Sequence, residues 1–126
     1  NPIDIHHILF YAKMYIGDSQ TMAAESAVLG VPFIRFNDFV GKIGYLHELE
    51  NRYELGYGFK SNDSEKMLSK VSEILSYPGL NKDWKNKRAK MLSDKINVSS
   101  FFSWFIGDYP NSKLMLLKKP DYINNF

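Results

Sequence analysis

Short apolar runs alternate with longer segments of helical periodicity over the first half of the chain. The runs 14–17, 33–36 and 56–59 predict three short strands, the third being the weakest. The spacing of apolar residues predicts helices over about 1–12, 20–29 and 42–53. Gly30 is expected to end the second helix, because glycine readily adopts the left-handed conformation common at helix ends.

The second half of the sequence is predicted to be mainly helical. Its most regular apolar stripe consists of Met67, Leu68, Val71, Ile74 and Leu75. This stripe predicts a helix that begins at residue 63 or 64 and ends before Pro78-Gly79. A basic helix is expected over 81–95, and a capping cluster at 97–100 precedes an aromatic helix over 101–106. From Asp108 the chain has no clear period, so a tail is expected.

This order of elements predicts an α/β fold. Strands that alternate with helices are typical of a parallel sheet with crossover helices. Three strands form only half of a doubly wound nucleotide-binding domain. The sequence therefore predicts a partial Rossmann-like, three-layer domain over residues 1–96, which would correspond to the second half of such a sheet. Residues 97–126 are expected to form a helical carboxyl-terminal extension.

The segment from Gly17 to Pro32 is the most informative about function. A strand that ends at Gly17 and a helix that begins with small polar residues bring backbone N–H groups to the carboxyl edge of the sheet, where the helix dipole is positive. This edge favours a phosphate or diphosphate, and Glu25, two turns into the helix, can accept hydrogen bonds from a ribose. Alternatively, Asp18 and Ser19 only cap the helix, and Glu25 is a solvated surface residue.

The same segment resembles the carboxyl-terminal domain of the UDP-N-acetylglucosamine 2-epimerase and glycosyltransferase-B superfamily. Epimerases of this group have an Asp-Ser turn, a helix bearing glutamates and a Leu-Gly-x-Pro exit. The residues at matching spacings are Asp18, Ser19, Glu25, Leu29, Gly30 and Pro32. A closer likeness extends from Asp4-Ile5-His6-His7 to about Gly58 and is to the DUF354 family, whose chemistry is not established.

The resemblance implies a site for a nucleotide sugar, above all a UDP sugar. Carried over to this chain, Ser19, Gln20, Thr21 and Met22 would lie at the diphosphate, and Glu25 would hold the uridine ribose. Gln20 and Thr21 replace the paired glycines of the epimerases, which hinders the approach of the backbone to a diphosphate. The Thr-Glu-Arg-Pro-Glu signature of true epimerases is also absent, which argues against 2-epimerase activity.

Asp18, Arg35, Lys42 and His6 are further candidates for phosphate or sugar contacts. Arg35 interrupts an apolar strand, where it either binds a diphosphate or sugar carboxylate or forms a salt bridge to Asp38 or Glu25. Lys42 at a helix start opposes the helix dipole, and this mild local cost indicates a ligand. His6 can face the crevice, but it points about 100° away from the adjacent His7, so the two are not expected to share a metal ion.

Composition narrows the class of protein and its partners. A hydrophobic content of 44% and a charged content of 24% are typical of a folded domain. No apolar run approaches the roughly 20 residues of a membrane helix, and neither an export signal nor cysteine is present, so we expect a cytoplasmic location. Acidic residues and Trp84 interrupt the bases between Lys82 and Lys95, which favours a solvated face over a nucleic-acid surface. No cofactor or metal is expected.

The sequence therefore predicts one half of a two-domain sugar-processing enzyme. An amino-terminal domain would face this half across a cleft and supply general acid and base groups, for glycosyl transfer or for isomerisation or hydrolysis of a sugar nucleotide. The alternative is a non-catalytic nucleotide-binding or oligomerising module of the same fold. The open edge of strand 14–17 and the aromatic helix 101–106 predict association with that domain or in a homo-oligomer.

Overall fold

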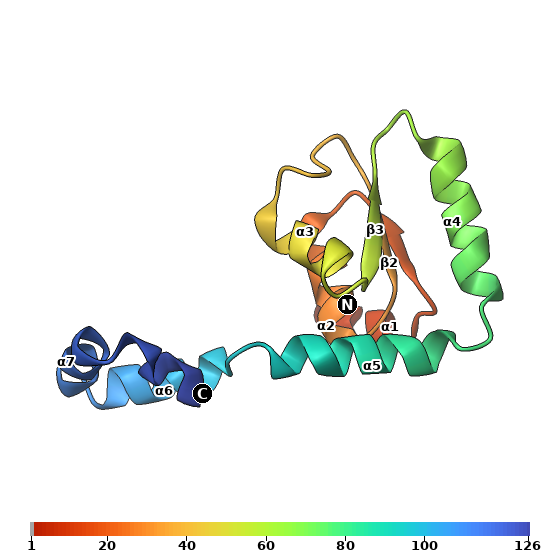
Figure 1. Ribbon diagram of the computed structural model, residues 1–126. Coiled ribbons are helices and arrows are strands. Elements are labelled where there is room, and N and C mark those ends of the chain that lie inside the picture. The colour runs from red at the N-terminus through yellow and green to blue at the C-terminus, as the bar shows by residue number, and fades with distance from the viewer. Residues whose placement is uncertain (1) are drawn as a thin grey trace. The chain divides into compact units, whose positions relative to one another are not determined.

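Figure 1 shows the computed structural model, which describes residues 2–126. The chain divides into two compact units between Met91 and Leu92, near the end of a long helix. This division lies slightly before the expected boundary after residue 96. Asn1, the expected cap of the first helix, lies outside the described residues.

The first unit is built on a three-stranded parallel sheet with the strand order β1-β2-β3. The strands are β1 (Tyr15–Gly17), β2 (Phe33–Phe36) and β3 (Gly56–Phe59). Ile16 lies beside Ile34, which in turn lies beside Tyr57. The predicted α/β class and the three parallel strands are therefore confirmed, although β1 begins at Tyr15 and not at Met14.

Helices cover both faces of this sheet. They are η1 (Pro2–Asp4), α1 (Ile5–Tyr11), α2 (Gln20–Leu29), α3 (Gly44–Asn51), α4 (Ser64–Ser76) and α5 (Leu80–Ser93). The helices α2 and α3 pack on one face, with α1 against α2, whereas α4 packs on β2 and β3 from the other face (Figure 1). The helix α2 ends at Gly30 in the left-handed conformation, as predicted. The helix α3 begins later than expected, because Gly41 has a positive φ and Ile43 is extended.

The core of the first unit lies between the sheet and its helices. Phe33, Ile34, Leu46 and Leu55 have no exposed surface. Trp84 of α5 is also buried, and its indole Nε1 donates a hydrogen bond to the carbonyl of Leu55 at 2.8 Å. Each large apolar side chain that is buried in this way contributes on the order of 1.5–3 kcal/mol, so these contacts supply most of the favourable free energy of folding.

A buried ion pair joins the sheet to α3. The side chain of Arg35 on β2 is fully buried, and its Nη2 and Nε donate to Glu50 Oε1 at 2.8 Å and 3.1 Å. Its Nη1 donates to Asn37 Oδ1 at 3.4 Å. Gly58 on β3 leaves the space that Glu50 needs, because a Cβ at that position would lie 2.8 Å from Glu50 Oε1.

The second unit is a small helical assembly held by aromatic rings. It contains α6 (Val98–Gly107), α7 (Asn111–Lys118) and η2 (Pro120–Asn125). The ring of Trp104 lies 5.2 Å from that of Tyr122 and 5.0 Å from that of Phe126 between centroids. Ser112 of α7 donates to the carbonyl of Phe105 at 2.6 Å. The tail expected from Asp108 is therefore wrong. An unbroken apolar run at 114–117 hides the helical period there.

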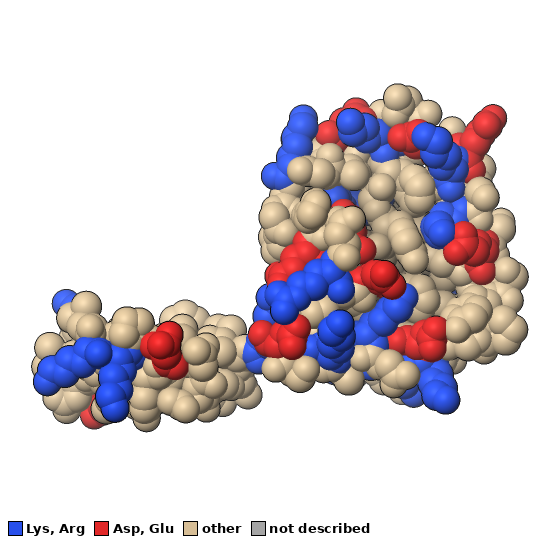
Figure 2. Space-filling model, in the orientation of Figure 1, with Lys and Arg blue, Asp and Glu red and all other residues tan. Residues whose placement is uncertain are grey.

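Charged side chains of both signs are mixed over the visible face of the first unit (Figure 2). The basic residues of α5 are part of this pattern. Lys87 lies 3.7 Å from the Glu54 carboxylate, and Arg88 Nε donates to the carbonyl of Val28. Such mixing is typical of a solvated face. Among the described residues, no helix is long and apolar enough to span a bilayer.

The buried ion pair yields a stability prediction. Replacing Glu50 by alanine leaves the Arg35 guanidinium buried without its carboxylate, so we expect the free energy of unfolding to fall by about 3–5 kcal/mol. Glu48→Ala on the same helix removes the surface pair with Arg52 and should cost less than about 1 kcal/mol. Urea denaturation followed by circular dichroism measures both, and equal losses would contradict the role assigned to the buried pair.

Candidate functional site

The turn from β1 into α2 has the geometry of a capped helix start. Ser19 is the N-cap residue in extended conformation, and its hydroxyl accepts a hydrogen bond from the Met22 N–H at 3.3 Å. The Ser19 carbonyl accepts from the Ala23 N–H at 3.2 Å. The alternative role of Ser19 as a helix cap is therefore confirmed. The Met22 N–H, expected at a phosphate, is already engaged within the protein.

Two backbone N–H groups remain available at this helix start. The N–H groups of Gln20 and Thr21 make no hydrogen bond within the described residues. They lie in the first turn of α2, where the positive end of the helix dipole is concentrated. The Thr21 side chain is exposed and that of Gln20 is half-buried. Of the four residues whose backbone was expected to bind an anion, only Gln20 and Thr21 therefore have N–H groups available for one. Their side chains lie beside these N–H groups.

Tyr15 is a component of the turn that sequence reasoning missed. Its phenol lies against the backbone and hydroxyl of Ser19. Burial, reinforced by the charge of Asp18, raises the pKa of this phenol, while hydrogen bonds with Ser19 partly offset the rise. Tyr15 and Gly17 are two residues apart on a strand and share one face. A Cβ on Gly17 would lie 2.7 Å from the Tyr15 Cζ. The sequence signal for this contact was a tyrosine and a glycine two residues apart on a predicted strand.

Glu25 and His6 come together on the surface of α1 and α2. The His6 Nε2 lies 3.5 Å from the Glu25 Oε2, a distance at which a protonated imidazole forms an ion pair. The two side chains are 61% and 34% exposed, so both remain open to a ligand. His6 and Glu25 were each predicted as candidates but not as a pair. A carboxylate beside an imidazole can accept hydroxyl protons and can also exchange a proton with a substrate.

Arg35 does not contact this surface. The expected contact with a diphosphate or sugar and the expected salt bridge to Asp38 or Glu25 are both wrong, because Arg35 is buried against Glu50. A cation in the middle of a covered strand needs a buried carboxylate, and Glu50 of α3 supplies one.

Lys42 is exposed in the loop before α3, and its ammonium lies 5.9 Å from the centre of the Phe39 ring. Within the described part of the chain no carboxylate forms a close ion pair with Lys42, although its charge acts on Asp38.

The loops that follow the three strands are tied together at the carboxyl edge. Asn37, after β2, donates to the carbonyl of Asp18, after β1, at 2.8 Å. Asp38 accepts from the Ser61 hydroxyl at 2.6 Å and from its backbone N–H at 3.1 Å. These hydrogen bonds from Ser61, followed by the charges of Lys42 and Lys60, lower the pKa of Asp38. The Asp18 side chain itself is exposed.

The start of α2 therefore offers hydrogen-bond donors, and the surface of α1 and α2 offers one carboxylate–imidazole pair. Gln20 and Thr21 present donors suited to an anion, and Glu25 presents an acceptor suited to hydroxyl groups. Over residues 2–126, no group of three or more histidine or acidic side chains is arranged to hold a metal ion. Together these groups are of the types that suit an anionic, hydroxyl-bearing ligand.

The cap makes a testable contribution to stability. Ser19→Ala leaves the Met22 N–H without its intramolecular acceptor, so the free energy of unfolding should fall by about 0.5–2 kcal/mol. Ser69→Ala is the matched control, because Ser69 is exposed in the interior of α4, where alanine is a better helix former. Thermal unfolding that ranks Ser69→Ala as the more damaging change would refute the assigned cap.

Comparison with known proteins assigns neither a family nor a function to this chain. No family model, no curated protein and no solved structure matches the chain. Its function therefore has to be inferred from the groups that meet at the carboxyl edge of the sheet and from the edge strand beside them.

Proposed function

We propose that this chain is the nucleotide-binding half of a sugar-processing enzyme of glycosyltransferase-B architecture, similar to the DUF354 family, and that its ligand is a UDP sugar. The observation that carries the proposal is the start of α2. There, two unpaired backbone N–H groups and the Glu25 carboxylate belong to one helix at the carboxyl end of a parallel strand.

The position of β1 in the sheet supports this assignment. β1 is an edge strand, since among the described residues it pairs only with β2. In a doubly wound fold, the equivalent strand lies at the point where the strand order reverses, and nucleotides bind in the crevice beyond its carboxyl end. Gly17 and the start of α2 lie at that end of β1. The diphosphate would accept hydrogen bonds from Gln20 and Thr21.

The uncovered side of β1 supports a partner domain. Alternation along the strand places Ile16 on the face opposite Tyr15, and α4 packs on that face against β2 and β3. Ile16 is consequently 49% exposed. On α1, the adjacent apolar residues Ile8 and Leu9 differ, because Leu9 is buried whereas Ile8 is 62% exposed. An amino-terminal domain that extends the sheet beside β1 would cover this surface.

Glu25 and His6 would take part in recognition in different ways. The two carboxylate oxygens of Glu25 suit the two hydroxyl groups of a ribose, which are adjacent donors. His6 orients this carboxylate through the contact at 3.5 Å. General acid and base groups for glycosyl transfer, isomerisation or hydrolysis would come from the facing domain, and this chain alone would be inactive.

The direct test is the affinity of the full-length protein for UDP. Hydrogen bonds to a charged acceptor are worth about 1.5–3 kcal/mol, so Glu25→Ala should weaken binding by roughly tenfold or more. Glu65→Ala is the matched control, because Glu65 is exposed on α4, away from the start of α2, and its loss should leave the affinity unchanged. Isothermal titration calorimetry measures all three proteins.

Equal affinity of the wild type and Glu25→Ala would exclude the ribose contact. Crystals soaked with UDP locate the diphosphate independently. Density at the backbone of Gln20 and Thr21 supports the assignment, and density at another edge of the sheet contradicts it.

A non-catalytic, self-associating module is the second candidate. It is favoured by the same exposed surface, because an edge strand flanked by apolar side chains can pair with a second copy as well as with another domain. Gln20 and Thr21, in place of the smaller residues that a close backbone approach prefers, also suit a module without turnover.

Self-association can be tested on the chain itself. We expect sedimentation velocity to show a dimer or higher oligomer that dissociates on dilution, with the Ile16→Lys variant shifted toward monomer. Leu68→Lys is the control, because Leu68 is 60% exposed on α4 and should not affect the assembly. A wild type that stays monomeric at high micromolar concentration would remove this candidate.

A further inference from the structure

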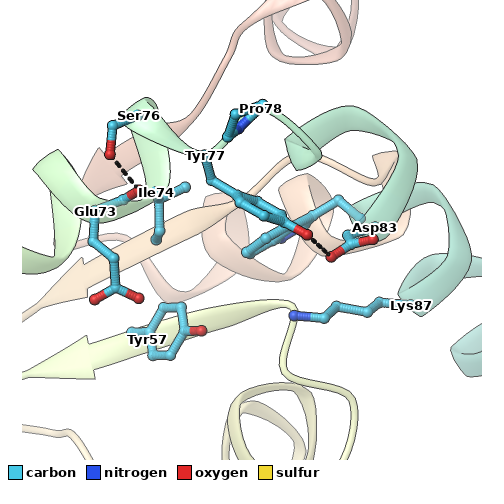
Figure 3. Close-up of a pocket in the computed structure, with 9 residues that line it drawn as sticks. Tyr57, Glu73, Ile74, Ser76, Tyr77, Pro78, Asp83 and Lys87 are labelled. Atoms are coloured by element: carbon cyan, nitrogen blue, oxygen red, sulfur yellow. Dashed lines mark hydrogen bonds between the residues drawn. The ribbon is translucent and has the colours of Figure 1, made fainter.

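A cavity lies on the α4 and α5 side of the first unit, away from the start of α2. Its volume is about 400 Å³, which falls within the range of roughly 300–1,000 Å³ typical of small-molecule sites. Tyr57 of β3 lines it together with residues from the end of α4 and the first turns of α5 (Figure 3). Tyr57 stands near the amino end of its strand, whereas the nucleotide site proposed above is at the carboxyl edge.

The cavity presents polar atoms that the protein does not use. The Tyr57 hydroxyl makes no hydrogen bond within the described residues and points toward Lys87, while Glu73 lies on the opposite side of the ring (Figure 3). Asp83 accepts a hydrogen bond from the Tyr77 hydroxyl at 2.6 Å through Oδ2, which leaves its Oδ1 without a partner in the part of the chain described. The Tyr57 hydroxyl as a donor and Asp83 Oδ1 as an acceptor are therefore available to a ligand.

Most of the charges that border the cavity are paired within the protein, and Asp83 is hydrogen-bonded to Tyr77. Lys70 donates to Glu73 at 2.6 Å, and its ammonium lies 4.9 Å from the centre of the Tyr57 ring. Lys87 donates to the carbonyl of Glu54 at 3.1 Å and lies 4.2 Å from the centre of the Trp84 ring. A cationic ligand would compete with two resident lysines for these aromatic faces. An anionic ligand would meet Glu73 and Asp83. At the faces of Tyr57 and Trp84 and beside the two carboxylates, a neutral ligand meets neither conflict.

Tyr77 provides the aromatic surface that no lysine covers. Its ring folds back toward α5, held by the hydrogen bond to Asp83, and passes close to Gly79, where a Cβ would lie 2.8 Å from the Tyr77 Cζ. Glycine at position 79 therefore allows the ring to take this position. The C–H face of a pyranose packs well on such a ring, and its hydroxyl groups both donate and accept hydrogen bonds.

From this geometry we propose that the cavity is a binding site for a neutral polyhydroxylated ligand of monosaccharide size. The Tyr57 hydroxyl donates to one sugar oxygen, Asp83 Oδ1 accepts from a sugar hydroxyl, and the Tyr77 ring packs on the sugar face. The site requires neither the nucleotide site nor a partner domain, because each of its residues lies in the first unit.

The fluorescence of Trp84, which lines the cavity, can report ligand binding. The chain has two tryptophans, so a Trp104→Phe background leaves the fluorescence of Trp84 alone. Glucose, glucosamine and glucuronate share a ring and differ in charge, and each is titrated to high millimolar concentration. We expect a saturable change with glucose and at least threefold weaker binding of the two charged sugars. The same titrations by NMR on the unsubstituted chain show whether the Trp104 change matters.

Two variants test the individual contacts. Tyr57→Phe removes only the free hydroxyl and should weaken glucose binding about threefold to tenfold, as expected for one hydrogen bond. Asp83→Asn should weaken it to a similar extent. The control is Tyr45→Phe, because Tyr45 is exposed on α3 and should bind glucose like the parent. No saturable response to glucose, a preference for glucosamine or glucuronate, or equal binding by Tyr57→Phe would each overturn the proposal.

Discussion

The buried contact between Arg35 and Glu50 determines how the first unit is assembled. A guanidinium in the middle of a covered strand is tolerated only because a carboxylate from α3 reaches it, and that carboxylate fits only because position 58 has no side chain. The same arginine holds Asn37, which in turn holds the backbone of Asp18. One buried charge therefore fixes α3, the loop after β2 and the turn where α2 begins.

Periodicity was sufficient to predict much of this architecture. The apolar runs gave all three strands, and the order of elements gave a parallel sheet, because adjacent parallel strands need crossover helices. It failed where the apolar period breaks down. The residues from Leu114 to Leu117 are four consecutive apolar residues, so they indicate no single apolar helix face, yet they lie in α7. Ile8 has helical spacing but remains exposed, because spacing does not reveal whether a neighbouring element covers a face.

The candidate sites were less predictable, because they depend on long-range pairing. Ser19 was recognisable as a cap from its local sequence. The contact of His6 with Glu25 and that of Arg35 with Glu50 join different elements, and no local pattern encodes either. The cavity beside Tyr57 was equally hidden, since its polar atoms come from β3, the end of α4 and the start of α5. A polar group can be identified as unpaired only when the hydrogen-bond partners of the surrounding polar groups are known.

The aromatic packing of the second unit has a consequence for its dynamics. No apolar side chain of α6 is fully buried, and the rings of Phe101 and Trp104 depend on contacts with Tyr122 and Phe126 near the chain end. The Asn97 N–H also donates to the carbonyl of Phe126, at 2.7 Å. Opening of η2 removes these ring contacts and this hydrogen bond together. Amide hydrogens of α6 should therefore exchange through sub-global opening, at lower free energy than those of β2, whose side chains are enclosed.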